Sequence, residues 1–278
     1  MRIEEVINKF IDTCEERQGN HALITGVPTG FARLDQLTAG FQKSQLITIC
    51  GAANMGKRSL ALNLARTAAI QDNLKVSILS LNLSQNDLGH KLICSQARVD
   101  SSRIRSGFLS ADDWNKLTQA ACILVDCKID CYFSNTSLID SDIVIIDSFQ
   151  RLKANDAAPN IQQEQISYSI ANELKNLAIK NNIPVVVLSS LNDWQIEKRS
   201  DRRPKLTDFK YGYSALADLS DLVLGVYRDE IYNKDENNPN RGTAEIIVLK
   251  QRMGPTGTAV LTFLNSYGRF EELAPEPE

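Results

Sequence analysis

The sequence lacks any apolar run that approaches the roughly 20 residues needed to cross a bilayer. Its start, Met1 to Glu16, is acidic and amphipathic, whereas a signal peptide begins with basic residues followed by an apolar run. A hydrophobic share of 43% and a charged share of 23% are ordinary for a folded domain. We therefore expect a cytoplasmic protein with no membrane association.

Histidine is scarce, and the six cysteines form no C-x-x-C pair. Disulfide frameworks belong to short secreted chains, so we expect free thiols in this chain of 278 residues. Cys122, Cys127 and Cys131 lie close together in the sequence, but no histidine is near them, which argues against a zinc site. Packing in the core is the expected role of these three thiols.

An excess of positive charge is also missing, because the net charge is −3. Any DNA binding must then come from a local basic patch. The best candidate is the run KRSDRRPK, although such a run is more often a solvated loop. Its basic residues are Lys198, Arg199, Arg202, Arg203 and Lys205.

What the sequence does contain is an alternation of strand and helix patterns. Residues 46–69 read as an apolar strand, a glycine-bounded loop and a helix. Three further runs rich in β-branched residues, at 76–83, 142–149 and 183–190, are typical of strands covered on both faces. Helical patterns such as 161–180 separate them. The chain is therefore predicted to be an α/β protein with a mainly parallel sheet flanked by helices.

Both ends of the chain differ from this pattern. Residues 243–264 look like two strands joined by a Gly-Pro turn, which predicts an antiparallel C-terminal edge. Residues 3–17 carry one narrow apolar stripe on a short helix that needs a partner. We expect a linker-type helix at 1–21, one domain at 22–273 and a disordered tail at 274–278.

A nucleotide-binding motif follows the first predicted strand. It matches the G-x-x-x-x-G-K part of the Walker A phosphate loop, in which backbone N–H groups cradle phosphates and the lysine neutralises them. The strand before it and the helix after it are the context that this motif requires. The residues are Gly51, Ala52, Ala53, Asn54, Met55, Gly56 and Lys57.

The residue after this lysine departs from the motif. A Ser or Thr hydroxyl should help to hold Mg²⁺ there, and the chain has Arg58 instead. Ser59 lies one residue further along the helix, a rotation of about 100°, and should not simply inherit the role. Arg58 could contact a phosphate or partly fill the metal position.

A second acidic motif ends the strand run at 142–149. Asp147 there matches a Walker B aspartate, which reaches Mg²⁺ through water, or else it is an ordinary strand-end turn residue.

Four segments, at 24–47, 104–117, 183–192 and 244–258, resemble the motor domain of DnaB-type replicative helicases. The resemblance runs from about Ile3 to Phe270 in one register. It implies a RecA-like P-loop NTPase fold and a hexameric ring that threads single-stranded DNA and binds ATP and Mg²⁺ between subunits. The first helix resembles the family's linker helix, which packs on the adjacent subunit. The family's separate N-terminal domain has no counterpart in the sequence.

The resemblance also assigns roles to single residues. Gly56, Lys57 and Asp147 match the nucleotide site, and Gln150 matches the glutamine that follows Walker B. Lys250 and Arg252 match the basic pair that reaches into a neighbour's ATP site, with Arg252 as the arginine finger.

Other matching positions have changed. Besides Arg58, Asn82 replaces the catalytic glutamate and Ser190 replaces a glutamine. An asparagine can hold a water molecule but cannot accept its proton, and losing such a base typically costs about 10²- to 10⁴-fold in rate. The loop 153–160 lacks most of the basic residues expected of a DNA-contacting loop.

Three functions remain open at this point. The chain can be a catalytically weakened homologue that forms a homo-oligomeric ring, or joins a mixed ring with an active helicase and lends it Arg252. It can be an active ATP-dependent 5′–3′ DNA helicase, or a RecA-like recombination ATPase. The first is favoured because two independent losses fall on the magnesium and water positions of one site.

Overall fold

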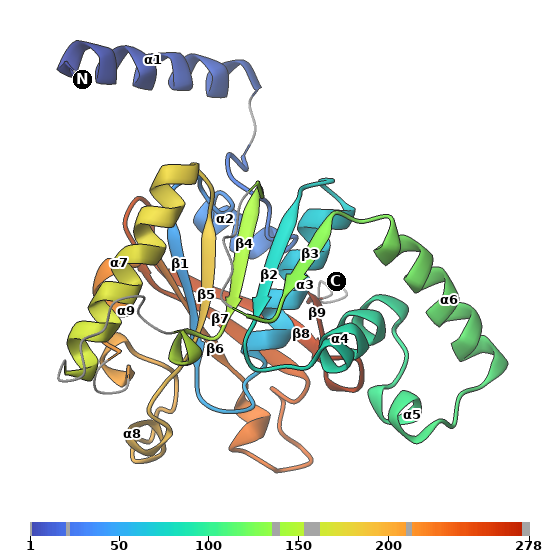
Figure 1. Ribbon diagram of the computed structural model, residues 1–278. Coiled ribbons are helices and arrows are strands. Elements are labelled where there is room, and N and C mark those ends of the chain that lie inside the picture. The colour runs from blue at the N-terminus through green and yellow to red at the C-terminus, as the bar shows by residue number, and fades with distance from the viewer. Residues whose placement is uncertain (1, 21–22, 135–139, 153–161, 210–212, 274–278) are drawn as a thin grey trace, which may run out of the picture.

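A computed structural model describes residues 2–20, 23–134, 140–152, 162–209 and 213–273. Its centre is a nine-stranded sheet with the order β3-β2-β4-β5-β1-β6-β7-β8-β9 (Figure 1). The strands from β3 to β6 in this order pair in parallel, and β7, β8 and β9 continue the sheet in antiparallel pairs. The strands are β1 (Leu46–Gly51), β2 (Val76–Ser80), β3 (Ile129–Tyr132), β4 (Ile143–Asp147), β5 (Val185–Ser190), β6 (Leu222–Tyr227), β7 (Thr243–Gln251), β8 (Gly257–Leu264) and β9 (Arg269–Glu272).

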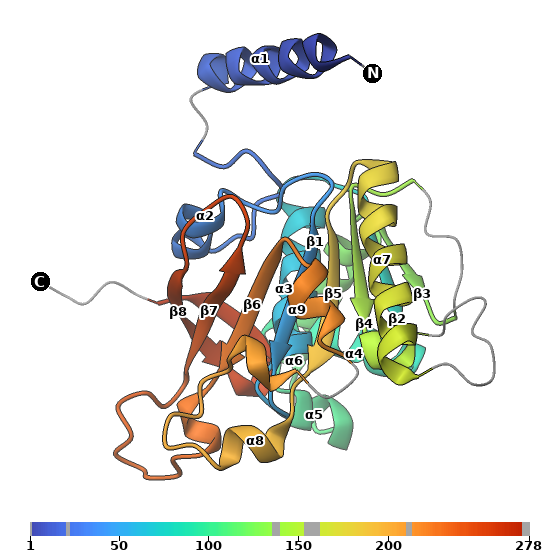
Figure 2. The same cartoon turned by 90° about the vertical axis from the view of Figure 1, so that its left-hand side faces the viewer.

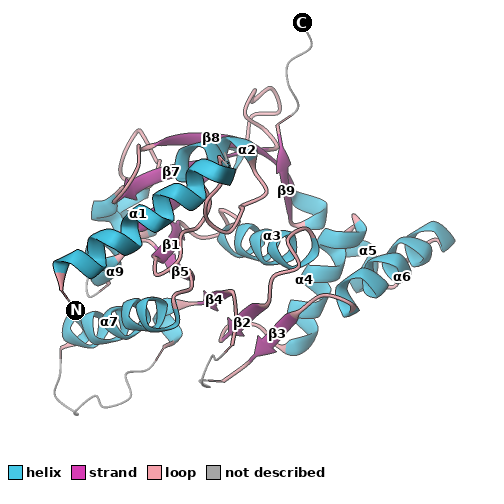
Figure 3. Ribbon diagram, turned by 90° about the horizontal axis from the view of Figure 1, so that it is seen from above, coloured by secondary structure: helices cyan, strands magenta, loops and turns pink. Residues whose placement is uncertain are grey.

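Helices cover both faces of this sheet. Helices α7 and α9 lie on one face, and α3 and α4 lie on the other, with α6 packed outside α4 (Figures 2 and 3). The helices are α1 (Ile3–Asn20), α2 (Ala32–Thr38), α3 (Lys57–Ile70), α4 (Gln85–Ala97), α5 (Ser101–Ser106), α6 (Ala111–Val125), α7 (Gln163–Asn181), α8 (Asp193–Glu197) and α9 (Ala215–Leu219).

The predicted α/β architecture is confirmed, and so is the antiparallel C-terminal edge. Strands β1, β2, β4 and β6 are buried along their whole length, as expected for strands covered on both faces. Strand β2 ends at Ser80, before the predicted end at 83, because the chain turns there toward the Ser84 N-cap of α4. Strand β9 is a third antiparallel strand that the sequence pattern did not predict.

The C-terminal ends of β1, β2, β4 and β5 meet at one edge of the sheet, because these strands are parallel. The phosphate-loop motif, Asn82 and Asp147 follow or end three of these strands. The topology therefore brings together residues that lie far apart in the sequence.

Helix α1 stands clear of the body of the molecule in Figures 1 and 2. Its apolar stripe is exposed, from Ile3 and Val6 through Ile7 and Phe10 to Ile11. Within the described residues, nothing covers this face. The stripe has the spacing that the sequence indicates.

The cysteines are free thiols, as expected, but the core role predicted for the group near residue 127 is wrong in part. Cys122 and Cys131 are exposed, and Cys127 is only half-buried. Cys122 lies on α6 but is not among the buried residues of that helix. Cys131 lies on β3, which is an edge strand with one open side. An apolar stretch in the sequence does not reveal which face of an outer element is covered.

Two expectations concern residues outside the described ranges. They are the disordered tail at 274–278 and the weak DNA contact of the loop at 153–160. Of the helices in the described part, none has the length and hydropathy needed to span a membrane.

Candidate functional site

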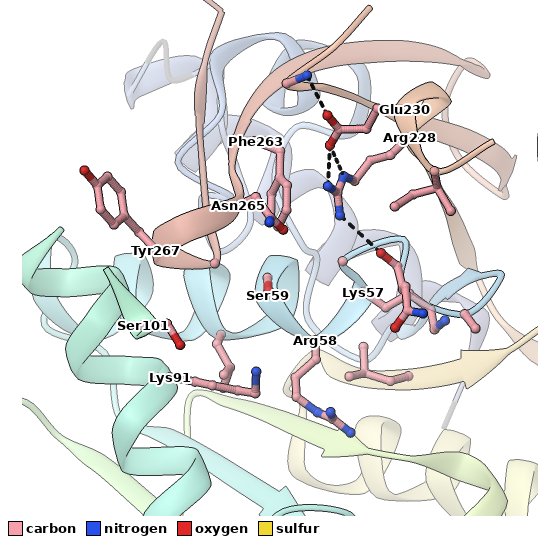
Figure 4. A pocket seen from close by; sticks show the side chains of 18 of the residues that line it. Lys57, Arg58, Ser59, Lys91, Ser101, Arg228, Glu230, Phe263, Asn265 and Tyr267 are labelled. Atoms are coloured by element: carbon pink, nitrogen blue, oxygen red, sulfur yellow. Dashed lines mark hydrogen bonds and ion pairs between the residues drawn. The ribbon is translucent and has the colours of Figure 1, made fainter. Parts of the chain in front are cut away.

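The phosphate-loop motif connects β1 to α3 at the edge where the parallel strands end. Gly56 has φ +97°, a left-handed conformation, and a Cβ at this position would lie 3.1 Å from the Phe270 ring. Both facts favour glycine here. The loop borders a cavity of about 1000 Å³, and α3 begins at its rim (Figure 4). An anion in this cavity would meet the N-terminus of a helix.

Lys57 lies folded over its own loop. Its Nζ donates to the carbonyl oxygens of Gly51 at 2.8 Å and Ala52 at 2.6 Å. Burial lowers the pKa of Lys57 to about 8, and nearby charges, including Asp193 and Asp147, only partly oppose this effect. The ammonium is therefore desolvated and held by neutral acceptors, which a phosphate can replace.

Arg58 and Asp147 form an ion pair across the cavity floor. Nε of Arg58 donates to Oδ2 of Asp147, and Nη2 donates to Oδ1 at 3.3 Å, so both carboxylate oxygens are engaged. Asp147 is buried, and its side chain is only 9% exposed. The guanidinium thus takes the contact that a Walker B aspartate otherwise makes toward a metal shell.

Ser59 is turned away from this ion pair. Figure 4 shows Ser59 and Arg58 pointing in opposite directions from α3. The Ser59 hydroxyl faces Gly268, where an added Cβ would lie 3.4 Å from its oxygen. Helix geometry explains this difference, since successive residues are rotated by about 100°.

These residues do not fit a magnesium site of the usual kind. Such a site combines a hydroxyl after the lysine with a water-bridged carboxylate. Here the hydroxyl is replaced by a cation and the carboxylate is already paired. Among the described residues, no cluster of three or more His, Cys, Asp or Glu side chains could hold a metal ion either.

Asn82 also lines the cavity, and both ends of its amide are engaged. Its Nδ2 donates to Ser148 Oγ at 2.9 Å, and its Oδ1 accepts from Arg151 Nε at 3.0 Å. Gln150 lies nearby and donates to Ser189 Oγ at 2.9 Å. The position predicted to hold a general base therefore carries a neutral amide in a hydrogen-bonded network.

Arg228 is among the residues of the site that the sequence analysis missed. Arg228 follows β6 and is buried against the ring of Phe263, with its guanidinium carbon 4.0 Å from the ring centroid. It donates to the Asn54 carbonyl at 3.2 Å and forms an ion pair with Glu230 (Figure 4). The available signal was a charged Arg-Asp-Glu run directly after a buried strand.

Lys250 and Arg252 do not reach this cavity. They lie at the end of β7, where Lys250 Nζ donates to the carbonyls of Ala217 and Asp218 at 2.8 and 2.7 Å. Arg252 lies 3.5 Å from Asp221 and is more than half exposed. Lys250 and Arg252, which are predicted to serve a neighbour's nucleotide site, are thus placed away from the cavity of their own chain.

The basic run divides into two groups. Arg199 is bound to the buried carboxylate of Asp208 at 2.5 and 2.8 Å, and Arg203 is bound to Glu245 at 2.7 and 2.6 Å. Lys198 lies 3.3 Å above the Trp194 ring, and Arg202 lies 4.7 Å above the Tyr232 ring. Lys205 is exposed, and its backbone N–H donates to Asp208.

Comparison with known proteins identifies the family of this chain. The model of a DnaB-like helicase C terminal domain matches residues 26–272. The replicative DNA helicase DnaB of Geobacillus stearothermophilus is 35% identical over 98% of this chain, and the replicative DNA helicase DnaC of Bacillus subtilis (strain 168) is 33% identical over 98%. In each case the alignment covers 62% of the relative, so the chain spans about three fifths of the length of these curated proteins.

Solved structures give the same result. The ATPase domain of G40P superposes with a TM-score of 0.87 at 27% identity, covering 97% of this chain and 99% of that one. A DnaB-like replicative helicase, studied with its interactions with primase, gives 0.85 at 27% identity and covers 96% of this chain and 66% of that one. The RadB recombinase gives 0.55 at 16% identity, which reflects a common fold alone. The RecA-like fold and the family match lead to one conclusion, that this chain belongs to the DnaB-like helicase C-terminal domain family.

Proposed function

We propose that the protein is a nucleotide-binding subunit of a DnaB-like ring in DNA replication, whose own ATP hydrolysis is weakened or lost. The observation that carries this proposal is the state of Asn82. Its amide is engaged at both ends, by Ser148 and Arg151, while the phosphate loop that ends in Lys57 is intact. A pocket of this kind can bind a nucleotide and still lack the group that activates water.

The other carboxylates around the cavity do not supply that group. Among the described lining residues, the carboxylates are Asp147, Glu230 and Asp235. Asp147 is paired with Arg58, Glu230 is paired with Arg228, and Asp235 accepts from the Asn237 backbone at 2.9 Å. None of the three combines an open carboxylate with the position of Asn82 at the end of β2.

Nucleotide binding itself follows from the retained residues. Phosphates would accept hydrogen bonds from the α3 N-terminus and from Lys57, which would leave the carbonyls of Gly51 and Ala52. Arg228 would keep the loop in shape through its bond to Asn54. ATP is the nucleotide that the family relationship favours.

Assembly into a ring is supported by two exposed features. The apolar stripe of α1 from Ile3 to Ile11 has no cover within the described chain, and a neighbouring subunit is the partner that the family relationship suggests. Arg252 is exposed at the end of β7, where it would act as a finger on a neighbour's nucleotide. Single-stranded DNA would then contact the basic run at 198–205.

Turnover of ATP with and without single-stranded DNA tests the proposal. We expect hydrolysis near background, and a rise of about 10²-fold or more when Arg58→Thr and Asn82→Glu are combined. The single variants serve as controls, because each restores only one of the two functions. Robust DNA-stimulated hydrolysis by the natural chain, abolished by Lys57→Ala, would show instead that it is an active helicase motor.

That second function, an active 5′–3′ helicase, is favoured by one set of observations. Lys57, Gln150 and Arg252 are all retained at positions that match the family. Mixing with an active relative tests the ring assembly that both proposals share, and ATP turnover by the natural chain alone separates them. In a mixed ring the natural chain should support the neighbour's hydrolysis, and its Arg252→Ala variant should lower it. Light scattering that finds only monomer at high concentration with nucleotide would contradict both ring proposals.

A further inference from the structure

We propose that Arg58 acts as a built-in cation in place of Mg²⁺, so that the pocket takes the metal-free nucleotide rather than its magnesium complex. This inference rests on the proposed nucleotide binding. The inference goes beyond the family relationship, because it concerns Arg58, and the Walker A motif has Ser or Thr at that position.

The first argument is the geometry of the ion pair. Arg58 contacts both oxygens of Asp147 through two nitrogens, an arrangement that combines charge with a fixed orientation. The Asp147 side chain is 9% exposed and the Arg58 side chain is 33% exposed, so the carboxylate lies beneath the guanidinium. Both oxygens of this carboxylate are thus already engaged by the more exposed guanidinium.

The second argument is electrostatic. A magnesium ion that used Asp147 would either displace the guanidinium or lie beside it. Displacement would break a charge pair whose carboxylate is almost fully buried, and lateral placement would bring a divalent cation against a like charge. Ser59 is not placed to compensate as a ligand, because it points away from Arg58 on α3 (Figure 4) and its hydroxyl lies near Gly268.

The third argument is that phosphate charge can be neutralised without the metal. A guanidinium has five N–H donors, and Asp147 engages two of them in the described structure. Arg58 can therefore keep the carboxylate and still donate to a phosphate oxygen. Lys57 and Lys91 line the same cavity and bring two further positive charges to it (Figure 4).

Calorimetric titration of the full chain with ADP and with ATP, once in excess EDTA and once in excess MgCl₂, tests this inference. We expect dissociation constants in EDTA that are equal to or tighter than those in MgCl₂. In Arg58→Thr, which restores the hydroxyl and frees Asp147, we expect affinity in EDTA to fall by about tenfold or more relative to MgCl₂. Arg58→Lys is the matched control, because it keeps a cation but not the two-nitrogen contact, and it should bind in EDTA more weakly than the natural chain.

A second measurement follows the metal directly. Electron paramagnetic resonance reports free Mn²⁺ in a solution of Mn²⁺ and ATP. Addition of the natural chain should increase the free Mn²⁺ signal, because the protein takes up nucleotide and leaves the metal behind. Addition of Arg58→Thr should decrease it.

The outcomes are distinct. If the natural chain binds nucleotide only with MgCl₂, or depletes free Mn²⁺, the inference is overturned and the proposed function stands. If it binds nucleotide in neither buffer, both are overturned. The comparison of buffers uses the natural chain alone, so it decides the matter even if Arg58→Thr fails to fold.

Discussion

Nζ of Lys57 lies 2.8 Å from the carbonyl oxygen of Gly51, the residue that begins the same loop. Desolvation at this position lowers the pKa of Lys57 to about 8 in the free protein. In the free protein, the Lys57 ammonium is therefore held by two neutral carbonyl acceptors and has a pKa of about 8. A bound anion would replace these acceptors.

This relationship predicts a pH dependence of nucleotide binding. An anionic phosphate favours the charged ammonium, so the pKa of Lys57 should be higher in the complex than its value of about 8 in the free protein. Below that value the lysine is charged in both states and affinity should not change through this group. Above it, binding requires proton uptake, and affinity should fall by up to about tenfold per pH unit. Titrations between about pH 7 and 9.5 check this, with Lys57→Met as the control that should bind weakly and without this pH dependence.

A second prediction concerns the glycine that precedes Lys57. Gly56→Ala should abolish nucleotide binding, because its φ of +97° is strained for alanine and its Cβ would lie 3.1 Å from Phe270. Gly107→Ala is the matched control, since Gly107 also has a positive φ, +78°, but no atom within 4 Å of the added Cβ. Both variants should lose stability, by roughly 1 kcal/mol for the backbone conformation, and only Gly56→Ala should lose affinity. Equal nucleotide affinity in the two variants would contradict the role given to the loop.

The basic run at 198–205 should act on single-stranded DNA through Lys198 and Arg202. These two residues contact aromatic rings, whereas Arg199 is held by a carboxylate and Arg203 by a carboxylate and by the Tyr227 ring at 5.0 Å. The double variant Lys198→Ala/Arg202→Ala should weaken DNA binding and lower the slope of log affinity against log salt by about 1.4, or 0.7 for each lost phosphate contact. Fluorescence anisotropy over a salt series measures this slope.

Arg199→Ala provides the contrast for that experiment. It would leave the carboxylate of Asp208, whose side chain is 2% exposed, without its ion pair. We expect a loss of about 3–5 kcal/mol of stability in this variant, as for other buried pairs from which one partner is removed. An unchanged salt slope for the Lys198/Arg202 pair would show that the run is only a solvated loop.

A fourth prediction addresses the support of Arg252. Asp221, whose side chain is 7% exposed, accepts from Lys175 at 2.6 Å and from the Leu46 backbone at 2.8 Å, and it lies 3.5 Å from Arg252. It thereby joins α7, β1 and the end of β7. Asp221→Ala should cost about 3–5 kcal/mol in denaturant unfolding, because it leaves Lys175 without its ion pair and with only the Ser44 carbonyl as acceptor.

Asp221→Asn is the matched variant, because it removes the charge but keeps an acceptor for Leu46. Its cost should be smaller than that of Asp221→Ala. Equal stability of Asp221→Ala and the natural chain would mean that this carboxylate does not anchor the β7 end.

Contiguous features of the chain could be read directly from the amino-acid order. The phosphate loop from Gly51 to Lys57 lies within one turn and one helix start, and strands β1, β2, β4 and β5 are mainly apolar runs. Such features depend on local geometry and on periodicity, which neighbours in the chain are sufficient to specify. The prediction that Arg58 stands in place of a hydroxyl and Asn82 in place of a carboxylate belongs to the same class.

Pairing between distant side chains was decided only by packing. Arg58 had two open roles in the sequence, and the approach of β4 to α3 selects a contact with Asp147, 89 positions away. The same holds for Arg228 beneath the loop, for Arg199 on Asp208 and for the exposed thiol of Cys122. A charge or a thiol can be satisfied by any of several neighbours or by water, and only the three-dimensional arrangement of strand ends and helix faces selects among them.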